Sequence, residues 1–186
     1  MNLELTKNNT NLFTFLWLSL VFIFLLSCKI PEESFENPLD VEANAAKGIY
    51  PPALIFSTDS LEIVSGEIVN IDLYALEIDS VTGAQIEIEY FDSSISIDSV
   101  SIGDFFVGDT NPIFIVENQT NKIIIYITYL GSNQSVSGTG IVASITLQSL
   151  IQGSTLVKVS ANSLLLDKFS NPIDIMGLGK VKINAR

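Results

Sequence analysis

Apolar and polar residues alternate in three stretches of the chain, residues 67–75, 84–91 and 140–148. A side-chain period of two is typical of a β-strand with one buried face. In the second stretch, this period predicts that the two isoleucines and the tyrosine point inward. It also predicts three outward side chains, which are Gln85, Glu87 and Glu89.

The stretch KIIIYITYL, residues 122–130, is apolar on both faces. Such a strand lies either at the centre of a sheet or under an interface. Residues 155–161 and 180–184 read as further strands, and Gly-, Asn- and Ser-rich turn signals separate all these stretches. No stretch from residue 28 onward carries the periodicity and caps of a helix. Many short strands separated by turns predict an all-β protein, an antiparallel β-sandwich.

The N-terminal region has a different pattern. An uncharged apolar run extends from Leu12 to Leu26, after the short polar stretch 1–11. This run is shorter than the roughly 20 residues that span a bilayer, and its position is typical of a secretory signal peptide. It ends in Leu25-Leu26-Ser27-Cys28, which resembles the bacterial lipobox. We therefore expect residues 1–27 to be a lipoprotein signal peptide and Cys28 to be acylated; the alternative is an uncleaved anchor with an incidental cysteine.

Cys28 is the only cysteine, so no disulfide is available to it. Several acyl chains on one residue give stable membrane attachment. Residues 28–52 then contain four of the six prolines and predict a flexible tether, unless Ile49 and Tyr50 at its end pack on the domain. Lys29 after the cysteine favours the outer membrane or cell surface of a bacterial envelope, with the inner membrane left open.

Charge and composition exclude several functions. The net charge is −12, and removal of Glu4 with Lys7 in the leader leaves it unchanged, so nucleic acid is not expected as a partner. The chain has no histidine, and its cysteine is assigned to acylation. The usual general base and the usual ligands of transition metals are therefore missing. The carboxylates of Glu87 and Glu89 read as neighbours on a solvated strand face. We expect no catalytic residues, no cofactor and no metal, although calcium on the loops stays open.

Residues 53–186 are expected to form one domain, and the order of its segments resembles the cohesin domain. The segments that carry this resemblance are SGEIVNIDLYAL, GAQIEIEYFDSSISIDSVSIGDFF, NKIIIYITYL, SGTGIVASITLQS and STLVKVSANSLLLDKFSNPIDI. The resemblance implies a nine-stranded jelly-roll β-sandwich. One departure is Tyr90-Phe91-Asp92, where the family usually has Tyr-Asp-Pro.

Cohesins bind dockerins, small calcium-binding modules, on one sheet face and so assemble polysaccharide-degrading complexes. The resemblance places that face on residues 83–90 and 123–130. The asparagine and aspartate that often receive hydrogen bonds from the dockerin correspond to Gly83 and Gln85, so this polar anchor is changed. The expected partner-binding residues are Gln85, Glu87, Glu89, Ile127 and Tyr129. The alternative that Ile127 and Tyr129 pack inward stays open.

The sequence is compatible with two binding functions, which differ in the class of ligand. The first is protein recognition through a sheet face by a lipid-anchored module, with a dockerin-like or other protein partner. The alternative is direct binding of polysaccharide, which sandwich modules usually achieve with a row of exposed aromatic residues. The only tryptophan, Trp17, lies in the leader, and no such row is evident. An envelope lipoprotein without a specific ligand is a third interpretation.

Overall fold

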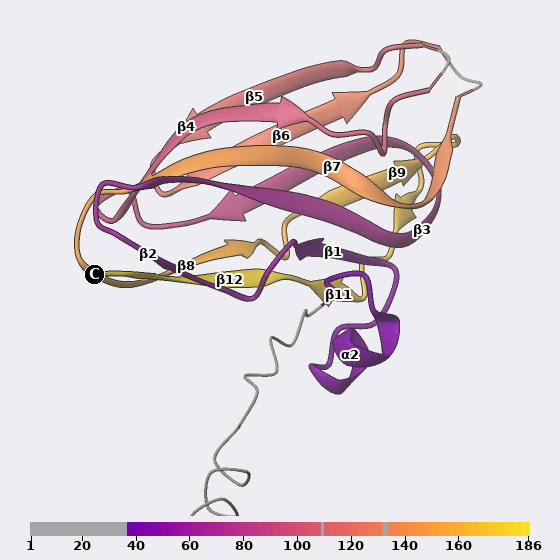
Figure 1. The fold of residues 1–186 in the computed structure, drawn as a ribbon. Coiled ribbons are helices and arrows are strands. Elements are labelled where there is room, and N and C mark those ends of the chain that lie inside the picture. Colours follow the sequence, from indigo (N-terminus) through magenta and orange to yellow (C-terminus); the bar gives the residue numbers. More distant parts are fainter. Residues whose placement is uncertain (1–36, 109, 132–133) are drawn as a thin grey trace, which may run out of the picture. The chain divides into compact units, whose positions relative to one another are not determined.

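The computed structural model describes residues 37–186 except 109, 132 and 133. The expected signal peptide, Cys28 and the first part of the expected tether lie outside the described residues. The described part is almost entirely β-structure, as the sequence pattern predicts (Figure 1). Its twelve strands are β1 (Ala53–Phe56), β2 (Ser60–Ile63), β3 (Ile68–Glu89), β4 (Ile95–Ile102), β5 (Ile113–Gln119), β6 (Lys122–Thr128), β7 (Val136–Ser149), β8 (Gly153–Val159), β9 (Leu164–Asp167), β10 (Pro172–Ile173), β11 (Gly177–Leu178) and β12 (Lys180–Ala185).

The 22-residue strand β3 organises the sandwich. It contains two of the stretches with alternating pattern, and its pairing register shifts between Ala75 and Val81. Glu77 and Ser80, in this segment, have positive φ angles of 48° and 54°. Figure 1 shows that the strand bends back here, so its two halves lie in different layers. A continuous β3 and the several short C-terminal strands mean that the expected count of nine strands is not confirmed.

The two halves of β3 have different neighbours. The first half pairs with β7 and β1, and β7 in turn pairs with β4. The second half pairs with β6 and β9, while β5 completes that layer by pairing with β6. Strand β8 pairs with both β3 and β12, and β12 pairs with β2. The result is the β-sandwich that the sequence predicts.

The core fills the space between the layers with β-branched side chains. Ile86 and Ile88 of β3 lie in the same buried cluster as Ile145 of β7, Val157 of β8 and Ile183 of β12. Burial of each such side chain contributes roughly 1.5–3 kcal/mol. In β12 and β8 the buried positions recur at every second residue, whereas β1 and the middle of β6 are buried at consecutive residues.

Residues 37–52 correct the expected tether. They contain the helix α2 (Val41–Ala46), whose N-cap Asp40 accepts a hydrogen bond at 3.0 Å from the backbone amide of Ala43. After the helix, Ile49 packs on a small buried cluster of β1 and β3 residues. The C-terminal part of the expected tether is thus attached to the domain. No helix in the described part of the chain is long and apolar enough to cross a bilayer.

Candidate protein-binding face

The outward surface of β9, β3, β6 and β5 is the best candidate for a binding site, and we call it the four-stranded face. Strand register places Gln85 of β3 between Leu164 of β9 and Tyr126 of β6. Ile115 of the edge strand β5 lies on the other side of Tyr126. These four side chains therefore form one row across four strands.

Both ends of this row are apolar. Ile115 of the edge strand β5 is 55% exposed with Ile113 beside it on the same strand, and Leu164 of β9 is exposed at the opposite end. Tyr126 is half-buried in the same row, and Thr128 is exposed next to Gly83 and Ile113 in the register. Exposed apolar residues surrounded by polar ones are a feature of protein interaction sites.

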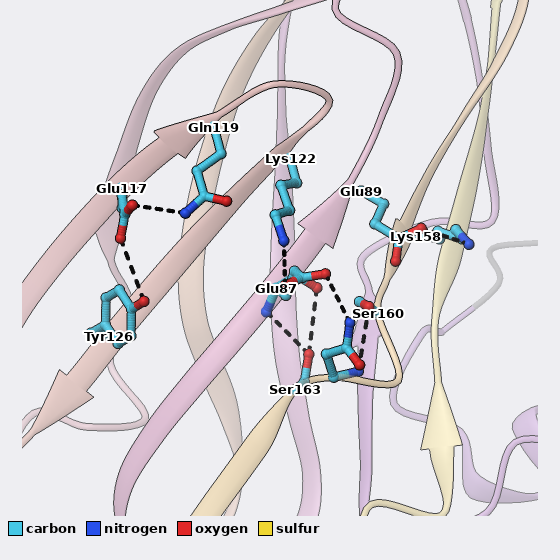
Figure 2. A network of polar contacts seen from close by, with 10 residues as sticks. Glu87, Glu89, Glu117, Gln119, Lys122, Tyr126, Lys158, Ser160 and Ser163 are labelled. Atoms are coloured by element: carbon cyan, nitrogen blue, oxygen red, sulfur yellow. Dashed lines mark hydrogen bonds and ion pairs between the residues drawn. The ribbon is translucent and has the colours of Figure 1, made fainter.

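Glu87 lies at one end of the face, in a network of polar contacts (Figure 2). Only 6% of the residue is exposed. Lys122 of β6 donates to the Oε2 atom at 2.9 Å, and Asn162, in the loop after β8, donates to the Oε1 atom at 3.3 Å. Ser163 in the same loop accepts a hydrogen bond from the Glu87 amide at 3.1 Å. Glu87 therefore fastens the loop between β8 and β9 to β3.

The network determines the charge state of Glu87. The hydrogen bond from Lys122 lowers the pKa of the carboxyl group below its usual range, against the opposite effect of burial, and Asn162 and Ser160 lower it further. Glu89 behaves similarly, because Lys158 lies 2.7 Å from its carboxylate and lowers the pKa together with Ser160. Both carboxylates are thus ionised and already paired with cations at neutral pH.

A second, smaller set of contacts lies on β5 and β6. Gln119 donates to Glu117 at 2.7 Å, and the hydroxyl group of Tyr126 donates to the other carboxylate oxygen at 3.5 Å (Figure 2). Glu117 is exposed, so its contacts hold the tyrosine ring across the strand pair without removing the carboxylate from water. A partner that covers this face would meet an oriented Tyr126.

The structure corrects three of the expected binding residues. Ile127 is 1% exposed and Tyr129 is 6% exposed, and both belong to the core cluster. The Tyr129 hydroxyl donates to the carbonyl of Phe106 at 2.5 Å, and burial raises its pKa. Ile127 and Tyr129 therefore cannot contact a partner on this face. Glu87 is buried in its ion pair, so it acts as a structural residue.

Gln85 and Glu89 keep partial exposure. The residues that the sequence reasoning missed are Tyr126, Ile113, Ile115 and Leu164. The sequence did contain a signal for Tyr126. Lys122 and Thr128, the polar residues of KIIIYITYL, both stand at even-numbered positions, which marks the even-numbered face of this strand as the outward one. Side chains of one strand face share parity, so Tyr126 belongs with them. No comparable signal marks β5 and β9, whose exposed isoleucines and leucine resemble core residues in sequence.

The described residues contain no group of three or more aspartate, glutamate, histidine or cysteine side chains placed to hold a metal ion. The carboxylates of the four-stranded face are paired with neighbouring lysine, glutamine or tyrosine side chains. This arrangement suits recognition by surface contact.

Comparison with known proteins gives similarity at the level of the fold. No protein-family model and no curated protein sequence matches the chain. Among solved structures, the chain is similar to a non-cellulosomal cohesin from the archaeon Archaeoglobus fulgidus, with a TM-score of 0.58 and 17% identity, over 72% of this chain and 91% of that one. The sixth cohesin of scaffoldin B from Acetivibrio cellulolyticus, solved in complex with a Cel5 dockerin, matches with a TM-score of 0.60 and 15% identity, over 72% and 98% of the two chains.

A type I cohesin–dockerin complex from Clostridium thermocellum, Coh-OlpC-Doc435, matches with a TM-score of 0.59 and 16% identity, over 72% and 95% of the two chains. Each of these matches spans nearly the whole of the solved chain. The domain therefore has a cohesin-like β-sandwich fold, as the order of its sequence segments suggests.

Proposed function

We propose that this protein is a lipid-anchored recognition module that binds a protein partner through its four-stranded face. The observation that carries this proposal is the row of apolar side chains on that face, with Ile115 and Leu164 exposed at its two ends. The solved cohesins with dockerins bound support a protein partner for a domain of this fold.

The partner is expected to differ from a common dockerin in its contacts. Gly83 and Gln85 stand where the family resemblance expects an asparagine and an aspartate, and Gly83 offers no side chain. The carboxylates of Glu87 and Glu89 are already paired. Binding energy must therefore come from Tyr126, Ile115 and their apolar neighbours. A dockerin-like module with an apolar contact surface fits this face.

Attachment to the envelope is the second part of the proposal. Acylation of Cys28 would hold the module at the outer membrane or cell surface, where it can meet secreted enzymes that degrade polysaccharides. Mass spectrometry of the full chain purified from its source organism tests this part. We expect Cys28 to be the first residue and to carry acyl chains; an intact leader with a free thiol would contradict it.

The recognition part is tested by differential capture. The full chain is immobilised through its exposed C-terminus and incubated with the secreted proteins of the source organism. We compare the unmodified chain with Ile115→Glu and with the matched control Val64→Glu. Val64 is 63% exposed and lies after β2, away from the four-stranded face. The partner should bind the unmodified chain and the control.

With Ile115→Glu, we expect the affinity for that partner to fall about 30-fold or more, because placing a charge at an apolar contact of the interface costs about 2 kcal/mol. Loss of binding after calcium removal would identify the partner as dockerin-like. Equal capture by all three proteins would contradict the assigned face. Retardation of the chain in a polysaccharide gel, abolished by Ile115→Glu, would replace the protein partner with a carbohydrate.

We further infer that the module binds without catalysis. Glu87 and Glu89 are held in ion pairs with Lys122 and Lys158, and the carboxylate of Glu117 accepts hydrogen bonds from Gln119 and Tyr126. Turnover of any polysaccharide or peptide substrate by the purified chain would contradict this part.

A further inference from the structure

A groove of about 610 Å³ lies where β8 and β12 continue the sheet past the Glu89 end of the four-stranded face. One side is the segment that follows α2, with Ile49, and the other is formed by the outward side chains of β8 and β12. We call it the lysine groove. Its apolar lining consists of Ile49, Leu156, Met176 and Leu178.

Close backbone packing shapes this groove. A Cβ atom on Gly177 would lie 2.6 Å from the side chain of Ile49 and 2.8 Å from that of Ala53. The absence of a side chain at this position lets the segment after α2 lie directly against β11. The groove is therefore a defined feature of the packed domain.

The charge of the groove is opposite to that of the domain. Residues 37–186 contain seven lysines and arginines against 17 aspartates and glutamates. Three of these seven cations, Lys47, Lys180 and Lys182, line the groove, with Asp59 as its only acidic residue. Asp59 is paired with Lys47, so no other carboxylate within the groove faces Lys180 and Lys182.

Lys180 and Lys182 are exposed on alternate positions of β12. Neither forms an ion pair with any residue that the structure describes, whereas Lys122, Lys158 and Arg186 each do. Moreover, Lys180 lies directly opposite Lys158 in the register of β12 and β8. Like charges in opposed positions destabilise a sheet. Glu89 compensates Lys158, so Lys180 and Lys182 are the positions at which a negatively charged ligand would relieve this repulsion.

We propose that the lysine groove binds an acidic peptide segment of a protein partner, one that alternates carboxylate and apolar side chains. Lys180 and Lys182 receive the carboxylates, and Leu156, Met176 and Leu178 contact the apolar side chains. No aromatic residue lines the groove, so it lacks the stacking surface that sugars use. A peptide of this kind uses both the lysines and the apolar lining of the groove, whereas a lipid headgroup would use only the lysines.

Fluorescence anisotropy with the purified full chain tests the proposal. The probe is a labelled (Glu-Leu)4 peptide, and the comparison peptides are (Lys-Leu)4 and (Glu-Ser)4. We expect binding of the first peptide only. The double variant Lys180→Glu/Lys182→Glu should weaken that binding about tenfold, since each exposed charge contributes up to roughly 1 kcal/mol.

Lys168→Glu is the matched control, because Lys168 is exposed in the turn between β9 and β10 and lies 5.1 Å from the ring centre of Phe169, away from the groove. It should change the affinity less than about twofold. Thermal unfolding checks that each variant is folded; if the double variant is not, Lys180→Gln should weaken binding about threefold. Ile115→Glu should leave peptide binding unchanged, which separates this site from the four-stranded face.

Several outcomes would overturn the proposal. Binding of (Glu-Ser)4 as tight as that of (Glu-Leu)4 would show that the apolar lining takes no part. Tighter binding of polygalacturonate, or of vesicles that contain phosphatidylglycerol, with the same loss in the double variant, would assign the groove to an acidic polysaccharide or to lipid. Absence of (Glu-Leu)4 binding would leave the groove without the proposed ligand.

Discussion

The four-stranded face and the lysine groove differ in what their charged side chains do. On the four-stranded face, Glu87 is paired with Lys122, and Glu89 is paired with Lys158. In the lysine groove, Lys180 and Lys182 have no such partner among the described residues. Apart from Glu117 and Gln85, the side chains left for a ligand on the first surface are mainly apolar, whereas the second surface offers two cations beside its apolar lining.

This difference indicates two kinds of recognition on one domain. Charges that are already paired add little to affinity, so shape and apolar area determine binding on the four-stranded face. Unpaired charges attract a ligand over a distance and are screened by salt. The experiments below test the comparison in order of decreasing effect.

The largest expected effect is a difference in the free energy of unfolding between substitutions on the two faces of β6. Ile127→Ala leaves a cavity in the core and should lower the free energy of unfolding by about 2–5 kcal/mol. Tyr126→Ala, at the adjacent residue, should lower it by less than about 1 kcal/mol, because the ring is only half-buried on the outer face. Urea unfolding of the full chain measures both. Similar losses would show that the outward face of β6 is part of the core.

A smaller loss of stability is expected when the ion pair between Glu87 and Lys122 is broken. Lys122→Met leaves the carboxylate of Glu87 buried without its cation. Loss of one partner costs about 3–5 kcal/mol for a fully buried pair. The Lys122 side chain is 31% exposed, so solvent reduces the expected loss to about 1–3 kcal/mol at pH 7.

The contribution of the Glu87–Lys122 pair to stability should depend on pH. The folded-state pKa of Glu87 lies below its usual value near 4.3, so the pair stabilises the domain above that pH and loses its contribution as pH falls through the folded-state value. The difference in stability between Lys122→Met and the unmodified chain should therefore shrink below about pH 4. A difference that does not depend on pH would show that the lysine acts through packing alone.

The smallest effect is the response to salt. Raising sodium chloride from about 0.05 M to about 0.5 M should weaken (Glu-Leu)4 binding in the lysine groove about fivefold. Binding of the captured partner to the four-stranded face should change less than about twofold, because apolar contacts are hardly screened. Titrations at four salt concentrations measure both slopes. Equal slopes would remove the distinction between the two surfaces.

The sequence pattern predicted the sandwich correctly but predicted the site only in part. In residues 84–91 polar and apolar residues alternate, and this pattern correctly predicted that Gln85 and Glu89 point outward. In KIIIYITYL both faces are apolar, so the orientation of Ile127 and Tyr129 was open, and the structure places both in the core. Pattern also missed α2, which is only six residues long and whose position depends on contacts of Ile49 with β1 and β3.

The sequence by itself determined the elements whose signal is local: the period-two strands, the turns between them and the order that resembles a cohesin. It also set the negative charge of the domain. Only the tertiary structure decided which isoleucines remain exposed, which carboxylates are paired and which lysines gather in a groove. These properties depend on strand register, because register brings Gln85 beside Tyr126 and Lys180 beside Lys158 from positions far apart in the chain.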